Sequence, residues 1–433
     1  MSTSLIEQLQ QRTALIAVLG LGYTGWPLAN ALSEHFEVIG YDPNEQRVSD
    51  LLNGVDRTGE SINASKGTAS MHLDSTPSML HKACCYIIAV PTPVNEQSEP
   101  DLQYLQSALR TVGAVLKRGD LVIVESTVYP GCTEEFCIPI LEEHSGLKGT
   151  IDFGMGYSPE RINPGDRIHT LASVTKLVAA SDAKWLDVVK FIYDVIVPAG
   201  VFVCSSIKVA EAAKITENIQ RDVNIALMNQ LAELYQRLHI PTGEVWQAAA
   251  TKWNFLPFRP GLAGGHCISV DPYYLLHKAS QVSFSPTLVA EARRINEMVK
   301  ARIVKRLLAH LEQAGVDKKS ARILIMGVTF KANVADVRNA KIAEVALELM
   351  KLGCHIDLSD PLADAAALQQ EYGLTLVQTE KVDYDIIVIA ADHAAYYTLD
   401  EDYFCQRTRT GALVADLNGI YRNKINQRNY WTL

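Results

Sequence analysis

Apolar runs and helical patterns alternate near both ends of the chain, and a long helical stretch lies between them. Short β-compatible runs are followed by helical patterns in residues 15–42 and again in residues 321–361. Such alternation is typical of parallel sheets with helices on both faces. We therefore expect two doubly wound α/β domains, at 1–205 and 316–433, joined by a long central helix and a helical middle domain at 206–315.

A glycine-rich turn follows the first apolar run. The sequence GLGYTG (20–25) opens a helical pattern, and the next strand ends on an aspartate about 20 residues later. In this context the glycines let the backbone approach a pyrophosphate, and the carboxylate binds ribose hydroxyls. We predict a Rossmann-like NAD site, with NAD favoured over NADP because the strand ends on an acid. The residues assigned to it are Gly20, Gly22, Tyr23, Thr24, Gly25, Asp42 and Arg47.

Two further apolar strands, within 84–94 and 121–131, end in Pro, Thr and Gly. Ligands of open parallel sheets bind beyond the carboxyl ends of the strands. The residues expected near the nicotinamide or the substrate are Pro91, Thr92, Glu125 and Thr127. Glu160 and Arg161 follow in another strand-to-loop transition, GYSPERINPGD, where a solvated loop carboxylate is the alternative interpretation of Glu160.

A helical pattern free of Gly and Pro runs from Ser206 to about Ile240 and would span on the order of 50 Å. It could connect domains and offer a dimer surface. Polar residues at steps of three and four, Lys214 and Asn218 among them, share one face of this helix. That face is either its solvated side or, given the Ala-rich and β-branched neighbours, a buried polar stripe.

The segment GLAGGHCISVDPYYL (261–275) sets Cys267 directly after two glycines and His266, four residues before Asp271. Most free cysteines are buried small hydrophobes, but neighbouring glycines let a ligand approach a thiol closely. A nucleophilic cysteine beside a nicotinamide suits aldehyde oxidation through a thiohemiacetal and a thioester. Alternatively, the cysteine is incidental and only an alcohol is oxidised.

The second α/β unit lacks the glycine fingerprint. Its first turn holds Gly327, then Lys331 and Arg338, and its second strand closes on Asp360-Pro361 as the first unit closes on Asp42-Pro43. The cationic residues suit a phosphate rather than a cradled dinucleotide. This favours a nucleotide-linked alcohol as the substrate.

Composition bears on several other classes of protein. A formal net charge of −9 over 433 residues argues against a nucleic-acid binder. The polar N-terminus lacks the apolar region of a secretory signal, and no apolar run approaches bilayer length, so we expect a soluble cytoplasmic protein without a membrane partner. Eight cysteines without a CxxC pair predict free thiols and no metal site.

Seven motifs together resemble the UDP-glucose/GDP-mannose dehydrogenase family, nearly end to end and in the family's order. They are GLGYTGWPLA, VPTPVN, ESTVYPGCTEE, GYSPERINPGD, KVAEAAKITENIQRDVNIALMNQ, GGHCISVDPYYL and GVTFKANVADVRN. The stretch WNFLPFRPGLAGGHCISVDPYYL resembles the bacterial branch that acts on UDP-N-acetylglucosamine or UDP-N-acetylgalactosamine. The resemblance implies oxidation of the sugar C6 hydroxyl to a carboxylate with reduction of two NAD, for surface polysaccharides, by a homodimer or dimer-based oligomer.

The resemblance also implies site residues. Cys267 would be the thioester nucleophile, while Lys214 and Asn218 would hold the C6 oxygen. Asp271 and Thr127 would position the water. The remaining residues implied to contact substrate are Glu160, which is also the candidate base for hydrolysis, Arg161, Arg259, Gly264 and Lys331, with Arg338 assigned to the cofactor.

Two residues depart from the expected pattern, and neither names the sugar. His266 stands where many UDP-glucose enzymes have another residue, and Ser269 replaces an expected glycine. UDP-glucose oxidation therefore stays open. So do a two-electron β-hydroxyacid-type dehydrogenase, which gives Cys267 no role, and a non-catalytic NAD-binding sensor with an oxidisable thiol.

Overall fold

The computed structural model describes residues 4–58, 70–162, 166 and 168–433. The chain divides into two compact units. One is Met1–Glu217 with Tyr273–Ser285, and the other is Asn218–Pro272 with Pro286–Leu433. The helical region predicted at 206–315 contributes to both units, and the three domain boundaries drawn from the sequence stay predictions.

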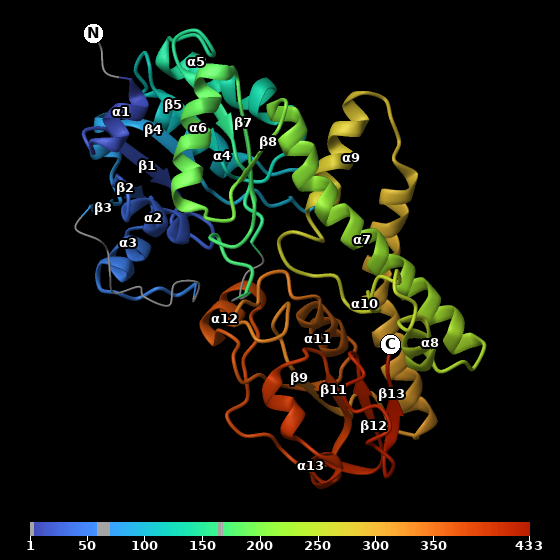
Figure 1. The fold of residues 1–433 in the computed structure, drawn as a ribbon. Helices are drawn as coiled ribbons and strands as arrows, with labels where there is room; N and C mark the ends of the chain where they lie inside the picture. Colours follow the sequence, from blue (N-terminus) through green and yellow to red (C-terminus); the bar gives the residue numbers. More distant parts are fainter. Residues whose placement is uncertain (1–3, 59–69, 163–165, 167) are drawn as a thin grey trace. The chain divides into compact units, whose positions relative to one another are not determined.

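The first unit contains an eight-stranded sheet in the order β3-β2-β1-β4-β5-β6-β7-β8 (Figure 1). Its strands are β1 Leu15–Leu19, β2 Glu37–Tyr41, β3 Met71–Asp74, β4 Ala83–Ile88, β5 Leu121–Val124, β6 Gly154–Tyr157, β7 Lys176–Ala180 and β8 Val201–Val203. Neighbouring strands are parallel except β6 and β7. The central strands are buried along almost their whole length, as expected when helices cover both faces of a parallel sheet.

Helices of the first unit follow most of these strands. They are α1 Leu5–Gln10, α2 Gly25–Ser33, α3 Glu45–Leu52, η1 Pro77–Lys82, α4 Gln103–Gly113, η2 Thr133–Cys137, α5 Ile138–Ser145 and α6 Ala183–Ile196. Asn44 and Asp182 cap the N-termini of α3 and α6, where their side chains accept hydrogen bonds from backbone amides. A buried cluster that includes Trp26, Phe36 and Trp185 forms a core on one side of the sheet.

The second unit contains a five-stranded, fully parallel sheet in the order β10-β9-β11-β12-β13 (Figure 1, orange to red). Its strands are β9 Arg322–Met326, β10 His355–Ser359, β11 Tyr384–Ile389, β12 Thr408–Asp416 and β13 Asn429–Trp431, and its helices are α8 Thr242–Ala249, α10 Thr287–Gln313, α11 Lys341–Lys351, α12 Ala365–Tyr372, η3 Ala394–Thr398 and α13 Glu401–Arg407. The strand order reverses between β9 and β11. Such a switch point is where open parallel sheets bind ligands.

Two helices contribute residues to both units, namely α7 (Ile207–Arg237) and α9 (Asp271–Gln281). The long helix predicted from the sequence is confirmed as α7, which is continuous over 31 residues. It stops before Ile240 because His239 adopts a φ of +55° and Pro241 cannot continue a helix. Within the described part of the chain, every helix falls short of the length and apolar character that a membrane crossing requires.

Both units repeat one local arrangement where their first strand ends. Gly20 follows β1 with a φ of +91°, and Gly327 follows β9 with a φ of +89°. In each unit the aspartate after the second strand, Asp42 or Asp360, accepts a hydrogen bond from the amide that follows this glycine, at 2.8 and 2.7 Å. The predicted fold class, with two Rossmann-like domains and a helical middle region, is confirmed.

Candidate functional site

The glycine turn of the first unit is shaped for close approach of a ligand. A Cβ on Gly25 would lie 1.8 Å from the carbonyl oxygen of Gly20, so only glycine lets α2 start this close to β1. A Cβ on Gly22, in contrast, would meet no protein atom within 4 Å. The amides at the start of α2 are therefore approachable from the Gly22 side, where a pyrophosphate would be held.

Asp42 is oriented by the backbone around it. One carboxylate oxygen accepts from Leu21 N, and the other accepts from Asn44 N at 3.0 Å. The nearby Arg47 donates through Nε to the Leu21 carbonyl and through Nη2 to Asp56, both at 2.8 Å. The cation that would recognise a 2′-phosphate is thus already paired, which suits NAD at this turn.

Thr92 and Thr127 lie beyond the ends of neighbouring strands and contact one another. Thr92 Oγ1 donates to the Thr127 carbonyl at 2.8 Å, and Tyr274 OH donates to the Thr92 carbonyl at 2.9 Å. Pro91, before them, is exposed. These contacts fasten the loops after β4 and β5 to one another.

A cavity of about 430 Å³ in the first unit brings Tyr23 and Thr24 of the glycine turn together with Glu160. Glu160 is no freely solvated loop carboxylate. Its Oε1 accepts from the amides of Arg161 and Ile162, both at 2.6 Å, and its Oε2 lies 3.7 Å from Lys176 Nζ. Residues 163–165 of the same motif lie outside the described residues.

Arg161 is paired within its own unit. Its Nη2 lies 2.7 Å from Glu217, and its Nη1 donates to the Thr175 carbonyl at 2.6 Å. The side chain therefore ties the Glu160 segment to α7 and to the loop before β7.

Glu125 differs from the expectation that it faces a ligand. The residue is 1% exposed, and its carboxylate forms a buried ion pair with Lys176 while it accepts from Tyr193 OH at 3.2 Å. Burial raises the pKa of Glu125 to about 7 against the opposing effect of Lys176. In the sequence, the only nearby indication of this ion pair was Lys176, which is the first residue of the apolar strand KLVAA. Its partner lies 51 residues earlier.

The polar stripe on α7 is buried at Glu211, Lys214 and Asn218, so the alternative of a solvated face is wrong for these residues, whereas Arg221 is exposed. Lys214 and Asn218 are 6% and 8% exposed and lie one turn apart. Glu211 of the same stripe accepts from Gly131 N at 2.5 Å and from Thr133 N at 2.9 Å, which caps η2. Burial raises the pKa of Glu211 to about 7.

Asn218 and Asp271, both predicted as site residues, contact one another. Asn218 Nδ2 donates to Asp271 Oδ2 at 2.6 Å, and the aspartate is 2% exposed. Asp271 also begins α9, where its amide donates to the Cys267 carbonyl at 2.9 Å. The predicted nucleophile, the predicted water-positioning carboxylate and one predicted C6-oxygen ligand are therefore connected in the second unit.

We call residues 261–270 the cysteine loop. Asn229 of α7 holds its first residue by exchanging hydrogen bonds with Gly261, at 3.0 and 2.8 Å. Arg293 of α10 donates to the Ile268 carbonyl at 3.4 Å, just past the half-buried Cys267. The start of the loop and the segment after Cys267 are thus anchored to the helices.

These anchors belong to a buried polar network between α7 and α10. Arg293 pairs with Asp222 at 2.6 Å, and Asn296 donates to the same carboxylate oxygen at 2.8 Å. Asn229 donates to Asn296 Oδ1 at 2.9 Å. A network of this kind holds the helices in one relative position because each broken bond leaves a buried polar group unpaired.

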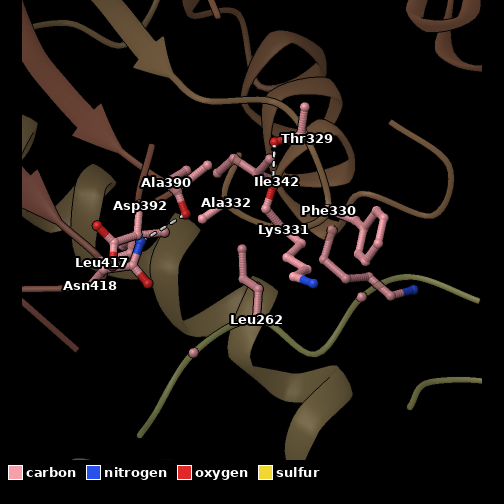
Figure 2. A pocket seen from close by; sticks show the side chains of 14 residues that line it. Leu262, Thr329, Phe330, Lys331, Ala332, Ile342, Ala390, Asp392, Leu417 and Asn418 are labelled. Atoms are coloured by element: carbon pink, nitrogen blue, oxygen red, sulfur yellow. Dashed lines mark hydrogen bonds between the residues drawn. The ribbon is translucent and has the colours of Figure 1, made fainter. Parts of the chain in front are cut away.

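The second unit contains a cavity of about 180 Å³ at its strand switch point. Figure 2 shows Asp392, Leu417 and Asn418 on one side and Phe330 and Lys331 on the other. These residues follow the carboxyl ends of β9, β11 and β12. The remaining lining residues come from the cysteine loop, the β9 loop, the end of β11 and the start of α11: Gly261, Leu262, Gly264, Thr329, Ala332, Lys341, Ile342, Ala390 and Ala391.

Two cations and a helix N-terminus border this cavity. Lys331 and Lys341 both line it, and α11 begins at Lys341, whose Nζ also donates to Glu344 at 2.8 Å. Lysine ammonium groups and a helix N-terminus together suit a diphosphate. The cavity thus brings the predicted Lys331 and Gly264 together, whereas Arg338 lies outside its lining and forms a two-pronged pair with Asp336, at 2.9 and 2.6 Å.

The surroundings of His266 favour its neutral form. Desolvation by the surrounding protein and the Arg338 charge lower the pKa of His266 to about 4, against the opposing effect of Asp336. The residue is exposed, however, so solvent screening weakens this lowering. A neutral imidazole does not stabilise a neighbouring thiolate as a cation would, so these surroundings do not equip His266 to activate Cys267.

Arg259 is exposed, and its charge acts on the Tyr397 phenol, which hydrogen-bonds to Asp392. Asp392 lines the cavity of the second unit. The structure therefore places Arg259 near the rim of that cavity rather than among the residues that line it.

Asp360, the aspartate after β10, is hydrogen-bonded by a side chain of its own unit. His393, fully buried, lies with Nε2 3.1 Å from Asp360 and also contacts Thr329 at 3.2 Å. Asp360 also accepts from backbone amides, as the equivalent aspartate of the first unit, Asp42, does from Leu21 and Asn44, so the histidine is the added partner. The histidine explains physically why the second unit, despite the same strand and turn arrangement, would not bind a ribose at Asp360.

Three family models match successive parts of the chain. They describe the NAD binding domain, the central domain and the UDP binding domain of the UDP-glucose/GDP-mannose dehydrogenase family, and they match residues 14–197, 208–298 and 324–423.

Individual relatives extend over almost the whole chain. "UDP-N-acetyl-D-glucosamine 6-dehydrogenase" of Salmonella typhi is 45% identical over 88% of this chain and 90% of its own length. Protein CapL of Staphylococcus aureus is 44% identical over 94% and 96%. Among solved structures, the UDP-D-ManNAc dehydrogenase of Pyrococcus horikoshii superposes with a TM-score of 0.87 at 29% identity, covering 96% of this chain and 98% of the other.

Proposed function

Because the chain belongs to the UDP-glucose/GDP-mannose dehydrogenase family and is an NAD-dependent UDP-sugar dehydrogenase, we propose that it oxidises the C6 hydroxyl of a UDP-N-acetylhexosamine to the carboxylate. The sugar is N-acetylglucosamine or N-acetylgalactosamine, and the uronate product enters surface polysaccharide synthesis. Two relatives at 45% identity named for UDP-N-acetyl-D-glucosamine support this choice of substrate.

NAD would be held at the glycine turn, with its pyrophosphate at the open Gly22 side and its adenosine ribose at Asp42. Bound NAD accepts one hydride in each of two oxidations. We assign Pro91, Thr92 and Thr127 to the nicotinamide end, since they follow β4 and β5, and Arg338 to the cofactor from the second unit.

Cys267 would carry the second oxidation. Its thiolate adds to the C6 aldehyde to form a C–S bond, giving a thiohemiacetal. Loss of a hydride and a proton converts this adduct to a thioester. Water then breaks the C–S bond, releasing the carboxylate and restoring the thiol. The alcohol, two NAD and one water thus give one carboxylate, two NADH and three protons.

The supporting roles follow from charge and hydrogen-bonding capacity. Lys214 and Asn218 would stabilise negative charge on the C6 oxygen, as a preorganised ammonium and amide can. Glu160 would remove a proton from the hydrolytic water, with Asp271 and Thr127 holding that water. The observation that carries the proposal is the hydrogen bond from Asn218 to Asp271, whose own amide donates to the Cys267 carbonyl.

The cavity of the second unit would take the UDP moiety. Lys331 and the start of α11 supply positive charge for the diphosphate, and Gly264 lines the same cavity. Lys341 also lines it, but its charge is shared with Glu344 at 2.8 Å. Arg259 at the rim and Arg161 in the first unit are assigned to the sugar.

Turnover with three sugar nucleotides tests the proposal. UDP-N-acetylglucosamine, UDP-N-acetylgalactosamine and UDP-glucose are compared at equal concentration, counting NADH formed per sugar consumed. We expect two NADH per UDP-N-acetylhexosamine, and Cys267→Ser should abolish acid formation, while Cys405→Ser, also half-buried, serves as the matched control.

Each contrary result has its own meaning. Faster turnover of UDP-glucose would replace the proposed substrate. One NADH per sugar in the wild type would refute the four-electron mechanism and favour a simple two-electron dehydrogenase. Binding of NAD without turnover of any sugar nucleotide would favour the sensor.

Self-association would use the exposed apolar residues of α7. Leu227 and Leu234, seven residues apart on the same face, are both exposed, and Trp253 nearby in sequence is 92% exposed. We propose that a second copy of the chain covers them in a homodimer. Leu234→Glu should convert a dimer into a monomer in analytical ultracentrifugation, and a monomeric wild type would reject the assignment.

A further inference from the structure

The cysteine loop packs tightly on the segment between β9 and α11, residues 327–340, which we call the β9–α11 loop. A Cβ on Gly264 would lie 2.7 Å from the Asn339 carbonyl oxygen, and one on Gly265 would lie 2.7 Å from the Phe330 ring. Gly265 also has a φ of +82°. Because Gly264 and Gly265 lack side chains, the cysteine loop can pack directly against the β9–α11 loop. Gly264 also lines the cavity of the second unit.

Asn339 holds this packing in place with its side chain. Its Nδ2 donates to the Gly265 carbonyl at 2.7 Å and to Ser269 Oγ at 2.8 Å, while Gly265 N donates to the Asn339 carbonyl at 3.2 Å. Ser269, 4% exposed, donates to the Gly265 carbonyl at 2.6 Å. We call these three residues the Asn339 clamp.

Two residues of the clamp flank Cys267 in the sequence. Gly265 and Ser269 each lie two residues from Cys267, so the backbone is fastened on both sides of the thiol. Asn339 is itself fixed, because its amide donates to Glu371 at 2.8 Å and the next amide donates to Tyr372 OH at 2.8 Å. The clamp therefore joins the β9–α11 loop to the cysteine loop by hydrogen bonds on both sides of Cys267.

The β9–α11 loop also forms one wall of the cavity in the second unit. Thr329, Phe330 and Lys331 line that cavity, and so does Gly264 next to the clamp. A diphosphate drawn toward Lys331 would act on the same short segment that holds Asn339. Nucleotide binding and the placement of Cys267 thus share one structural element.

We propose that Asn339 and Ser269 are positioning residues that couple occupation of this cavity by a nucleoside diphosphate to the reactivity of Cys267. The inference rests on the proposed function in that it takes the cavity as the UDP site. It also gives a role to Ser269, which stands where glycine was expected. The serine hydroxyl closes the clamp, whereas a glycine would leave it open.

Alkylation of Cys267 by iodoacetamide, followed by peptide mass spectrometry with and without saturating UDP, measures the coupling in the full chain. UDP affinity is measured by calorimetry on the same samples. The variants are Asn339→Gly and Ser269→Gly. Glycine is the appropriate replacement for Asn339 because the residue has a φ of +50°, where alanine would be strained. Asn423→Gly, exposed and with a φ of +61°, is the matched control.

We expect UDP to change the wild-type alkylation rate by about fivefold or more, and Asn339→Gly and Ser269→Gly to reduce that effect to less than about twofold. UDP affinity should stay within about threefold. With the sugar nucleotide, kcat should fall by roughly tenfold or more in Asn339→Gly while KM changes by less than about threefold, because a misplaced nucleophile costs rate rather than binding.

Other outcomes overturn the inference. If the clamp variants keep the full UDP effect, the nucleotide only shields the thiol. If the wild-type rate ignores UDP although UDP binds, the coupling is absent while the proposed function stands. If UDP does not bind the wild type at all, the proposed function itself fails. Loss of UDP binding in the variants would show that Asn339 merely supports the cavity wall.

Discussion

Asn218 on α7 donates a 2.6 Å hydrogen bond to Asp271 at the start of α9, across 53 residues of sequence. The contact aligns a buried amide with a buried carboxylate whose own backbone amide bonds to the Cys267 carbonyl. Asp271 is 2% exposed and is the first residue of α9, a position where a negatively charged side chain is favoured.

Asp271→Asn should separate the second oxidation from hydrolysis. The asparagine Oδ1 can still accept from Asn218, so the geometry is kept while the charge is lost. We expect thioester hydrolysis to slow by roughly 100-fold and an acyl adduct to accumulate on Cys267, visible by intact-protein mass spectrometry. Full turnover without an adduct would show that the carboxylate has no part in hydrolysis.

Gly22→Ala should weaken NAD binding without unfolding the first unit. The added Cβ meets no protein atom within 4 Å, so the melting temperature should be unchanged. It would project into the space assigned to the pyrophosphate, and we expect at least about a tenfold loss of NAD affinity by calorimetry. UDP binding is the internal control, and unchanged NAD affinity would move the pyrophosphate elsewhere.

The buried ion pair of Lys176 and Glu125 should matter for the stability of the first unit. Lys176→Met leaves a buried carboxylate without its cation and should cost roughly 3–5 kcal/mol, measured as loss of unfolding free energy in urea. Lys176→Met with Glu125→Gln should recover much of this cost, because Gln still accepts from Tyr193.

Glu211 should make stability fall as pH rises near neutrality. Burial raises its pKa from the ordinary 4.5 to about 7, so between these values the folded chain binds more protons at this carboxyl than the unfolded chain does. The corresponding stabilisation is complete below pH 4.5 and is lost as pH rises through about 7. Glu125 titrates in the same direction.

Scanning calorimetry from pH 5 to pH 8 checks this. The melting-temperature deficit of Glu211→Gln relative to the wild type should shrink as pH rises, because the glutamine cannot ionise. Glu143→Gln, on the exposed side of α5, should show no such trend. A deficit that grows with pH would mean that the carboxylate caps η2 mainly in its charged form.

The sequence pattern predicted those features that depend on residues close together in the chain. The glycine turn, Asp42 and the extent of α7 follow from residues within one strand-turn-helix unit or one helix, and the structure has them as expected. Glu125 and Asn339 are different, because their partners Lys176 and Ser269 lie 51 and 70 residues away. Nothing near Glu125 distinguishes a strand-end carboxylate that meets a ligand from one that enters a buried ion pair.

Asp360 and Asp42 occupy the same place in the two α/β units but differ in their side-chain surroundings. The carboxylate keeps the position of its counterpart Asp42, yet His393 already occupies it. Redesigning the second unit as a dinucleotide receptor would therefore require at least two edits on an unchanged backbone: freeing Asp360 from its histidine and restoring glycines after Gly327. The chain thus contains this strand, turn and aspartate arrangement twice, once with a buried histidine at the carboxylate and once at the glycine turn to which NAD is assigned.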